Sequence, residues 1–346
     1  MEKHWPTLKE ELMAMLRIPS PSGYTAKVNA YIEAQLQKLN VPYAKSVKGA
    51  ITATLPGKDN ERQRTLSAHI DTLGAMVKEI KSDGKLKLTN IGGLGWANVE
   101  GENCLILTSG GKEVSGTLLL NKASSHVHGQ DTLKTERKAE TMQVRLDAVV
   151  KSEQDARDLG IEVGDFVVFD PRTTETDTGF IKSRHLDDKA GVAIMLAVLK
   201  ELKETNTQLP YTTNFFFSHY EEVGHGATAG LPEKTHEFLC IDMGAPGEGQ
   251  QSDEFSVSIC AKDSSGPYTY EFKEKLVKMC KEHNIPYQVD IYPYYGSDAS
   301  GALRAGYDFT AALIGPGVDA SHSYERTHKD SLLATAELTL LWCKSD

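Results

Sequence analysis

The sequence has no long hydrophobic run. None of its apolar stretches approaches the roughly 20 residues that a membrane-spanning helix needs. Residues 1–7 are polar and lack the apolar core of a secretory signal. We therefore expect a protein that does not span a membrane and is not exported by the secretory route.

Cysteine is scarce as well. The chain contains five cysteines, an odd number, and no Cys-x-x-Cys pair. These spacings suggest neither a disulfide framework nor a zinc site made of thiolates. A reducing cytoplasm is the predicted location. The cysteines are Cys104, Cys240, Cys260, Cys280 and Cys343.

A third absence is an excess of positive charge. The 346 residues include 38 Lys and Arg against 48 Asp and Glu, which gives a formal net charge of -10. No Lys/Arg-rich stripe overrides this balance, so nucleic acid and anionic lipid are not expected partners. The hydrophobic share of 40% is typical of a soluble globular chain long enough for one large or two ordinary domains.

Hydrophobic periodicity predicts an α/β protein. Helices are predicted from a capping box at Thr7–Glu10, over 25–39 and over 189–204, and strands at 51–55, 64–69, 213–218 and 238–242. Between these regions the pattern changes to short strands separated by Gly, Asp and Lys turns. They are predicted at 77–79, 86–88, 104–107, 117–120, 143–149 and 166–169.

The simplest domain organisation is one α/β domain interrupted by an insert. Residues 1–75 and 179–346 are predicted to form a mixed sheet with helices on both faces. Residues 76–178 are predicted to form a small β-rich domain. Internal repeats and low-complexity tracts are absent from the sequence.

Five short segments place metal-capable side chains at the end of an apolar strand or in the loop after it. Open α/β sheets bind ligands at this position. Taken singly, each segment has an ordinary explanation, such as a helix N-cap or a solvated acid. They are Ala68-His69-Ile70-Asp71, Leu186-Asp187-Asp188, Tyr220-Glu221-Glu222, Cys240-Ile241-Asp242 and Ser321-His322-Ser323.

Taken together, the segments predict a pair of metal ions. Their order His-x-Asp, Asp-Asp, Glu-Glu, Asp, His supplies two imidazoles and three carboxylates as ligands, which suit Zn²⁺, Co²⁺ or Mn²⁺. Three carboxylate charges against two dications leave one positive charge, which a hydroxide neutralises. A hydrolytic site with two metals requires this balance.

The ordered motifs resemble those of the M42 glutamyl or deblocking aminopeptidases, a family of the metallopeptidase H clan. The resemblance covers nearly the whole chain. The insert lies between Asp71 and Asp187, whereas the related M20 family carries an extra domain in the later gap between Asp242 and His322. Further shared motifs are Pro21-Ser22-Gly23-Tyr24, Ile91-Gly92-Gly93, Gly164-Asp165-Phe166-Val167 and Gly296-Ser297-Asp298-Ala299.

The resemblance implies a role for each candidate residue. Asp187 bridges both metals, and His69 and Asp242 each bind one metal with different neighbours. The Asp71 carboxylate accepts the second ring N–H of His69 and fixes its tautomer. Glu221 is the general base, points away from the metals and passes a proton from water to the leaving amine. The implied ligands are His69, Asp187, Glu222, Asp242 and His322.

Several positions depart from the family pattern. Lys189 stands where Arg is common, Gly224-His225-Gly226 replaces a Gly-Leu-Arg-Gly-like stretch, and Glu325 lies one position early. His328 is therefore a rival to His322, although the His-Ser pair favours His322. Two further groups are expected to have no special role, with pocket shaping as the alternative for the first: the loop histidines His185, His219 and His225, and the edge-strand tyrosines Tyr287, Tyr292, Tyr294 and Tyr295.

The resemblance implies an exopeptidase that acts on peptides with a free N-terminus. It also implies that the insert builds dimers, which associate into tetrahedral dodecamers. One alternative keeps the metals but cleaves another bond, as a deacylase, dipeptidase or carboxypeptidase; the position of the insert argues against it. Another alternative is a non-catalytic scaffold protein, which would not need Glu221 beside five ligands.

Overall fold

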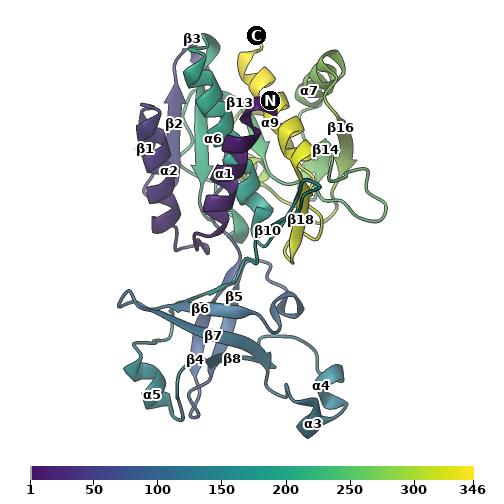
Figure 1. Cartoon of the computed structure of the whole chain (residues 1–346). Coiled ribbons are helices and arrows are strands. Elements are labelled where there is room, and N and C mark those ends of the chain that lie inside the picture. The colour runs from purple at the N-terminus through teal and green to yellow at the C-terminus, as the bar shows by residue number, and fades with distance from the viewer. Residues whose placement is uncertain (1) are drawn as a thin grey trace. The chain divides into compact units, whose positions relative to one another are not determined.

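The computed structural model describes residues 2–346 and divides into two compact units (Figure 1). One, the α/β unit, joins the chain up to Asp71 with Arg172–Asp346, and the other, the insert, is Thr72–Pro171. The insert thus spans 72–171 rather than the predicted 76–178. Its end differs because the strands after Pro171 pair with the last strand of the α/β unit.

A nine-stranded mixed sheet forms the centre of the α/β unit, in the order β1-β2-β12-β3-β13-β17-β14-β15 with β16 beside β14. Strands β12, β3, β13 and β17 are parallel, whereas β2 and β14 run antiparallel to them. The strands are β1 Tyr43–Lys45, β2 Ile51–Leu55, β3 Gly57–His69, β12 Leu209–Ser218, β13 Thr235–Ile241, β14 Val257–Asp263, β15 Gly266–Pro267, β16 Tyr287–Ile291 and β17 Thr310–Pro316.

The central strands are continuous apolar runs because both of their faces are covered. In β12 every residue from Thr212 to Ser218 is buried, including the consecutive Phe215, Phe216 and Phe217. A separate three-stranded sheet has the order β10-β11-β18. Its strands are β10 Thr174–Glu175, β11 Phe180–Ser183 and β18 Glu325–His328.

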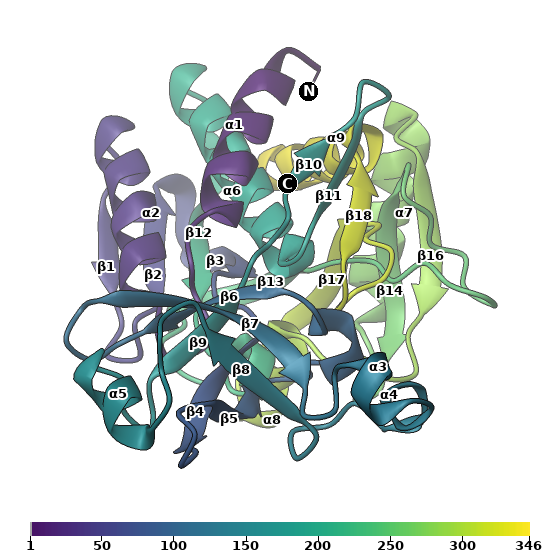
Figure 2. The same cartoon turned by 60° about the horizontal axis from the view of Figure 1, so that its bottom comes forward.

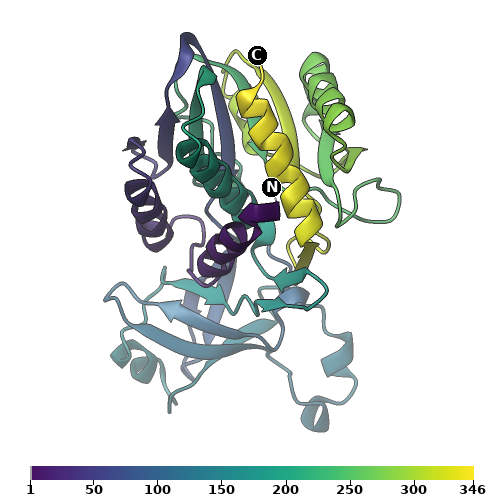
Figure 3. The ribbon, with the colours of Figure 1, turned by 45° about the horizontal axis from the view of Figure 1, so that its top comes forward.

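Helices α6 and α9 are neighbours that pack against the sheet, and α1 packs on α6 (Figure 3). Helix α6 is buried along nearly its whole length. Helix α1 begins at Trp5 with Pro6 in its first turn, so Thr7 lies inside the helix and the predicted capping box does not form. The helices are α1 Trp5–Leu16, α2 Ala26–Lys38, α6 Leu186–Glu204, α7 Tyr270–His283, α8 Asp298–Arg304 and α9 Lys329–Lys344, with short 3-10 turns η1 Glu2–His4 and η3 Glu221–Val223.

Lys189 connects α6 to the end of α1. Its side chain is 1% exposed, and its ammonium group donates hydrogen bonds to the carbonyl oxygens of Met15 at 2.9 Å and Ile18 at 2.6 Å. Carbonyls at a helix C-terminus have no partner within the helix. The Met15 carbonyl also accepts from the backbone N–H of Ile18 at 2.9 Å, so Lys189 adds a second donor there and supplies the donor for the Ile18 carbonyl.

We expect Lys189→Met to lower the free energy of unfolding by about 2 kcal/mol, because it removes two hydrogen bonds and takes the ammonium donor away from the Ile18 carbonyl. The matched control is Lys200→Met, on the same helix but with a side chain that is 35% exposed. That control should cost less than about 0.5 kcal/mol. Urea unfolding of the metal-free proteins measures both changes, and equal losses would contradict the assigned role of Lys189.

The insert is a closed barrel with the strand order β4-β5-β8-β7-β6-β9 (Figure 2). All six strands predicted in this region occur in it, and their inward residues form a separate apolar core. The predicted α/β class with a β-rich insert is confirmed. The elements are β4 Gly74–Ile80, β5 Leu86–Ile91, η2 Trp96–Val99, β6 Asn103–Leu107, β7 Glu113–Leu120, α3 Ser125–His128, α4 Asp131–Lys134, β8 Met142–Leu146, α5 Glu153–Asp158 and β9 Phe166–Phe169.

Across residues 2–346, no helix has both the length and the apolar character needed to cross a membrane.

Candidate metal centre

Parallel strand ends bring the predicted motifs together. Strand β3 ends at His69, which pairs in register with Ser218 at the end of β12. Strand β13 pairs with β3 and ends at Ile241, directly before Asp242. Because neighbouring parallel strands end at the same edge of a sheet, these loops meet there.

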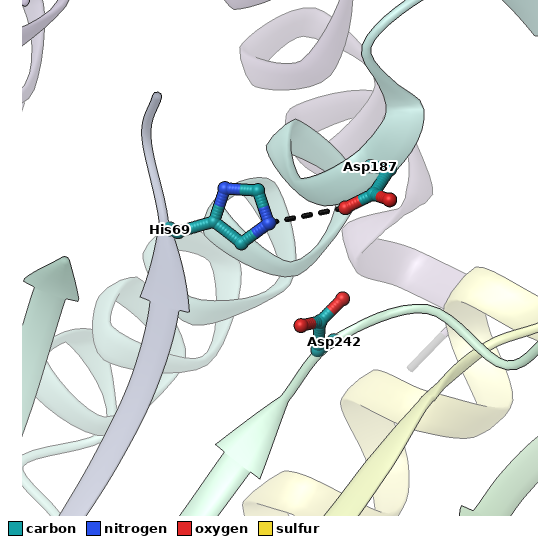
Figure 4. Close-up of side chains that lie close together, drawn as sticks. All are labelled: His69, Asp187 and Asp242. Atoms are coloured by element: carbon teal, nitrogen blue, oxygen red, sulfur yellow. Dashed lines mark hydrogen bonds and ion pairs between the residues drawn. The ribbon is translucent and has the colours of Figure 1, made fainter. Parts of the chain in front are cut away.

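The five predicted ligands form two overlapping groups. Within each group the candidate ligand atoms lie within 4.8 Å of one another. Figure 4 shows the first group, in which Nε2 of His69 lies 3.0 Å from Oδ1 of Asp187. In the second group, Nε2 of His322 lies 3.5 Å from Oδ2 of Asp187 and 3.6 Å from Oε2 of Glu222. The groups are His69, Asp187 and Asp242, and Asp187, Glu222 and His322.

Asp187 is the member that the groups share, with one oxygen directed to each side. His69 and Asp242 lie in the same group, unlike the expectation that they have different neighbours. His328 lies outside both groups: its Nε2 is 2.8 Å from the carbonyl oxygen of Thr178, and its Nδ1 accepts from the backbone N–H of Asp330. Between the two rival histidines, the structure brings His322 to the cluster.

The contact predicted between Asp71 and His69 is made by a different group. Nδ1 of His69 donates to the backbone carbonyl oxygen of Asp71 at 2.8 Å, while the Asp71 carboxylate is 3.9 Å away. The expectation of a carboxylate acceptor is therefore wrong, because the chain turn after β3 places the nearer carbonyl there. The bond leaves Nε2 of His69 facing the cluster.

The Asp71 carboxylate instead holds the backbone of the paired glutamates. It accepts hydrogen bonds from the N–H of Glu221 at 3.2 Å and of Glu222 at 3.4 Å. The hydroxyl of Ser22 donates to it at 2.5 Å, so the Pro-Ser-Gly motif supports the same carboxylate. Asp71 is fully buried, and these donors satisfy its charge.

The two glutamates face different parts of the cluster. Oε2 of Glu221 lies 3.7 Å from Nε2 of His69, whereas Glu222 approaches His322. The expectation that Glu221 points away from the ligands is therefore wrong. Glu221 lines the same cavity as four of the candidate ligands, which is the place that the predicted role of base requires.

Two further buried acids hold the backbone of the candidate ligands. Glu325 accepts from the backbone N–H of Asp187 at 3.1 Å and of His322 at 3.0 Å, so one carboxylate joins both segments. Asp188 accepts from the N–H of His69 and of Gly191, which ties β3 to α6. No role is predicted for Glu325 from the sequence, although its place three residues after His322 is a usable signal.

Burial governs the electrostatics of the cluster. It raises the pKa of Glu221 and Glu222 well above the usual range and that of Asp242 to about 7. Burial alone would lower the pKa of His69, but its bond to Asp187 and the nearby carboxylates raise it well above 6.5. Burial opposes ionisation of Asp187 too, yet the two histidines lower its pKa. A bound cation would relieve this concentration of negative charge.

A cavity of about 460 Å³ adjoins the ligands. Tyr294 and Tyr295 line it, and the Tyr295 hydroxyl donates to the carbonyl oxygen of Met243 at 2.7 Å. These tyrosines follow β16 and are not part of that edge strand, so the expectation of edge-strand packing is wrong for them. None of His185, His219 and His225 is among the lining residues of this cavity, which does not favour pocket shaping.

The donor set fits divalent metal ions. Two imidazole nitrogens and three carboxylates are ligands typical of zinc and similar ions, and Asp187 has an oxygen for each group. The carboxylate of Glu221, which belongs to neither group, lies beside them. On an α/β sheet, these features define the class of metal-dependent hydrolases.

Comparison with known proteins gives the family. The pattern that defines the M42 glutamyl aminopeptidases matches residues 49–338. A Bacillus subtilis strain 168 protein described as a candidate aminopeptidase, YhfE, is 52% identical over 336 residues, which are 97% of each chain. The chain therefore belongs to the M42 glutamyl aminopeptidase family. It is a metal-dependent aminopeptidase, and its family binds divalent metal ions.

Two further relatives are more distant. The glutamyl aminopeptidase of Lactococcus lactis is 26% identical over 219 residues, which are 63% of this chain and 60% of that one. The TET1 peptidase of Pyrococcus horikoshii has the same fold, with a TM-score of 0.86 at 20% identity over 98% of this chain and 100% of that one.

Proposed function

We propose that this chain removes single residues from the free N-terminus of peptides by means of two divalent metal ions. The observation that carries the proposal is the shared position of Asp187, whose two oxygens face the two ligand groups. His69 and Asp242 complete one metal site, and Glu222 and His322 complete the other. The ligand types favour Zn²⁺ or Co²⁺, with Mn²⁺ as a further candidate.

When bound, the metals supply Lewis acidity that polarises the scissile carbonyl and acidifies the attacking water. Glu221 then accepts the proton of that water at its carboxylate and delivers it to the nitrogen of the leaving amine. The Asp71 carboxylate keeps Glu221 in place through the backbone. The Asp71 carbonyl keeps Nδ1 of His69 protonated, so that Nε2 is free to be a ligand.

We also propose that the protein acts as a homo-oligomer. The Pyrococcus TET1 peptidase, which has the same fold, can assemble into a tetrahedron or a large octahedral shell. Dimers built by the insert and a tetrahedral dodecamer are the assembly proposed for this chain. Light scattering of the purified protein would measure it. We propose a cytoplasmic location, which the five unpaired, buried cysteines support.

The function is tested with free and N-acetylated aminoacyl-anilides. Protein stripped with a chelator and then supplied with Zn²⁺, Co²⁺ or Mn²⁺ is expected to hydrolyse only the free-amine substrates. Chelator alone should abolish the activity, because the metals supply the Lewis acid. Cleavage of the acetylated substrates would favour a deacylase, and metal binding without any hydrolysis would favour a scaffold protein.

A further inference from the structure

The loop after β12 carries both glutamates of the metal centre, and we call residues 219–228 the acid loop. Its far end packs against its beginning: a Cβ added at Gly226 would lie 3.1 Å from the Cα of Glu221. Gly224 and Gly226 also line the cavity. Side chains on a loop keep their positions only if surrounding groups hold its backbone.

His219 holds the beginning of the acid loop. It is 4% exposed, and its Nε2 accepts a hydrogen bond from the backbone N–H of Gly23 at 2.9 Å. Because a backbone N–H can only donate, Nε2 carries no proton and Nδ1 does. Nδ1 lies 3.0 Å from the carbonyl oxygen of Lys48 and donates to it. The neutral imidazole therefore connects three separate parts of the chain.

Lys48 holds the end of the same loop through its side chain. Its ammonium group donates to the carbonyl oxygens of His225 and of Gly226, the latter at 2.9 Å, and to the Thr228 hydroxyl at 3.3 Å. Hydrogen bonds from a charged donor are the stronger kind. The Lys48 carbonyl thus accepts a hydrogen bond from His219, the first residue of the acid loop, and the Lys48 ammonium donates to residues near the end of the loop.

The turn that carries Lys48 is shaped for this contact. Gly49 has φ +95, and a Cβ there would lie 3.0 Å from Nδ1 of His219. A side chain at this position would be strained by the backbone and would press against the imidazole. Glycine at residue 49 therefore allows the turn to approach the acid loop closely.

We propose that Lys48 and His219 are positioning residues that clamp the acid loop and keep Glu221 and Glu222 in place. The inference rests on the proposed function, because the clamp serves the roles given there to the two glutamates. All acceptors of the Lys48 ammonium lie within the six residues that follow Glu222. Neither residue touches the ligands, so their effect passes through the loop backbone.

The sharpest test removes the Lys48 ammonium and then restores it chemically. Lys48→Cys is expected to lower kcat by about 10- to 100-fold, the cost of misplacing a reacting group, with KM changed by less than about twofold. Alkylation with 2-bromoethylamine rebuilds a lysine-like side chain at residue 48 and should restore most of kcat. The five native cysteines are buried, so the new thiol is the accessible one.

Two controls accompany this experiment. Lys45→Cys removes an exposed lysine from the neighbouring strand β1 and should keep wild-type kcat before and after alkylation. Alkylation of Lys48→Cys with iodoacetamide, which adds no ammonium, should restore nothing. A wild-type kcat for Lys48→Cys, or equal recovery with both reagents, would overturn the proposal.

His219 provides a second, independent variant. His219→Gln keeps an acceptor for the Gly23 N–H and should retain more kcat than His219→Phe. The Phe variant keeps the ring shape but loses the ring nitrogens that contact Gly23, Lys48 and the Thr25 hydroxyl. Equal activities of the two variants would count against the clamp. A fold defect in either variant is detected by its thermal unfolding midpoint.

Hydrogen exchange tests the clamp independently of the proposed function. The backbone amides of residues 221–227 should exchange faster in Lys48→Cys and return to the wild-type rate after aminoethylation. If the wild-type protein hydrolyses no free-amine anilide, the proposed function fails. The exchange rates still show whether Lys48 holds the acid loop in place. Unchanged exchange in Lys48→Cys would refute the clamp even in an active enzyme.

Discussion

Glu221→Gln is expected to lower kcat by about 10³-fold, because the amide cannot accept the proton of the attacking water. The side chain keeps its shape, and the backbone N–H of residue 221 can still donate to Asp71. Glu221 belongs to neither ligand group, so the metal content should stay that of the wild type. Steady-state kinetics and elemental analysis of the same preparation measure both quantities.

The control for this substitution is Glu248→Gln, which makes the same chemical change at an exposed site. It should leave kcat within about twofold of the wild type. Two outcomes would remove Glu221 from the role of base. One is a kcat reduced less than about tenfold, and the other is a loss of activity that parallels a loss of metal.

Asp187→Asn is expected to remove both metals and all measurable activity. Asp187 is the carboxylate common to both ligand groups, and a neutral amide is a much weaker ligand for a divalent ion. Asp242→Asn and His322→Gln each affect one group, so each should leave one of the two metals bound. Elemental analysis after dialysis against metal-free buffer distinguishes these cases.

Asp308→Asn, at an exposed position, is the matched control and should retain both metals. Retention of one metal by Asp187→Asn would contradict the shared role of Asp187. If Asp242→Asn and His322→Gln each lost both metals, the two groups would act as a single site. A metal content of one in the wild type would itself refute the dinuclear proposal.

Much of the fold is predictable because local periodicity is strong. The central strands are apolar throughout, as in β12, and the six insert strands alternate with clear turn residues. The candidate ligand positions are equally visible, since His69 and Asp242 stand at strand ends that the hydrophobic pattern locates. The predicted capping box at Thr7 does not form because the helix already begins at Trp5, with Pro6 in its first turn. Thr7 therefore lies inside the helix and cannot be its N-cap.

The roles that the sequence did not predict depend on contacts between distant residues. Glu325 reaches the backbone of Asp187 across 138 positions, and Lys48 reaches Gly226 across 178. No local pattern indicates that a backbone N–H or carbonyl needs a partner so far along the chain. The Asp71 carbonyl shows the same limit at short range, because the turn geometry and not the residue type selects it as the acceptor for His69.

Residue types and their spacing were therefore sufficient to indicate the class of fold, the β-rich insert, the candidate ligand residues and the family. Hydrophobic burial and metal binding can be recognised in the local sequence, because each needs particular side chains at particular intervals. The closure of the insert into a barrel, the direction of Glu221 and the contacts of Lys48 with the acid loop emerged from packing. Such features depend on which backbone groups folding brings within about 3 Å, a distance that side-chain identity does not encode.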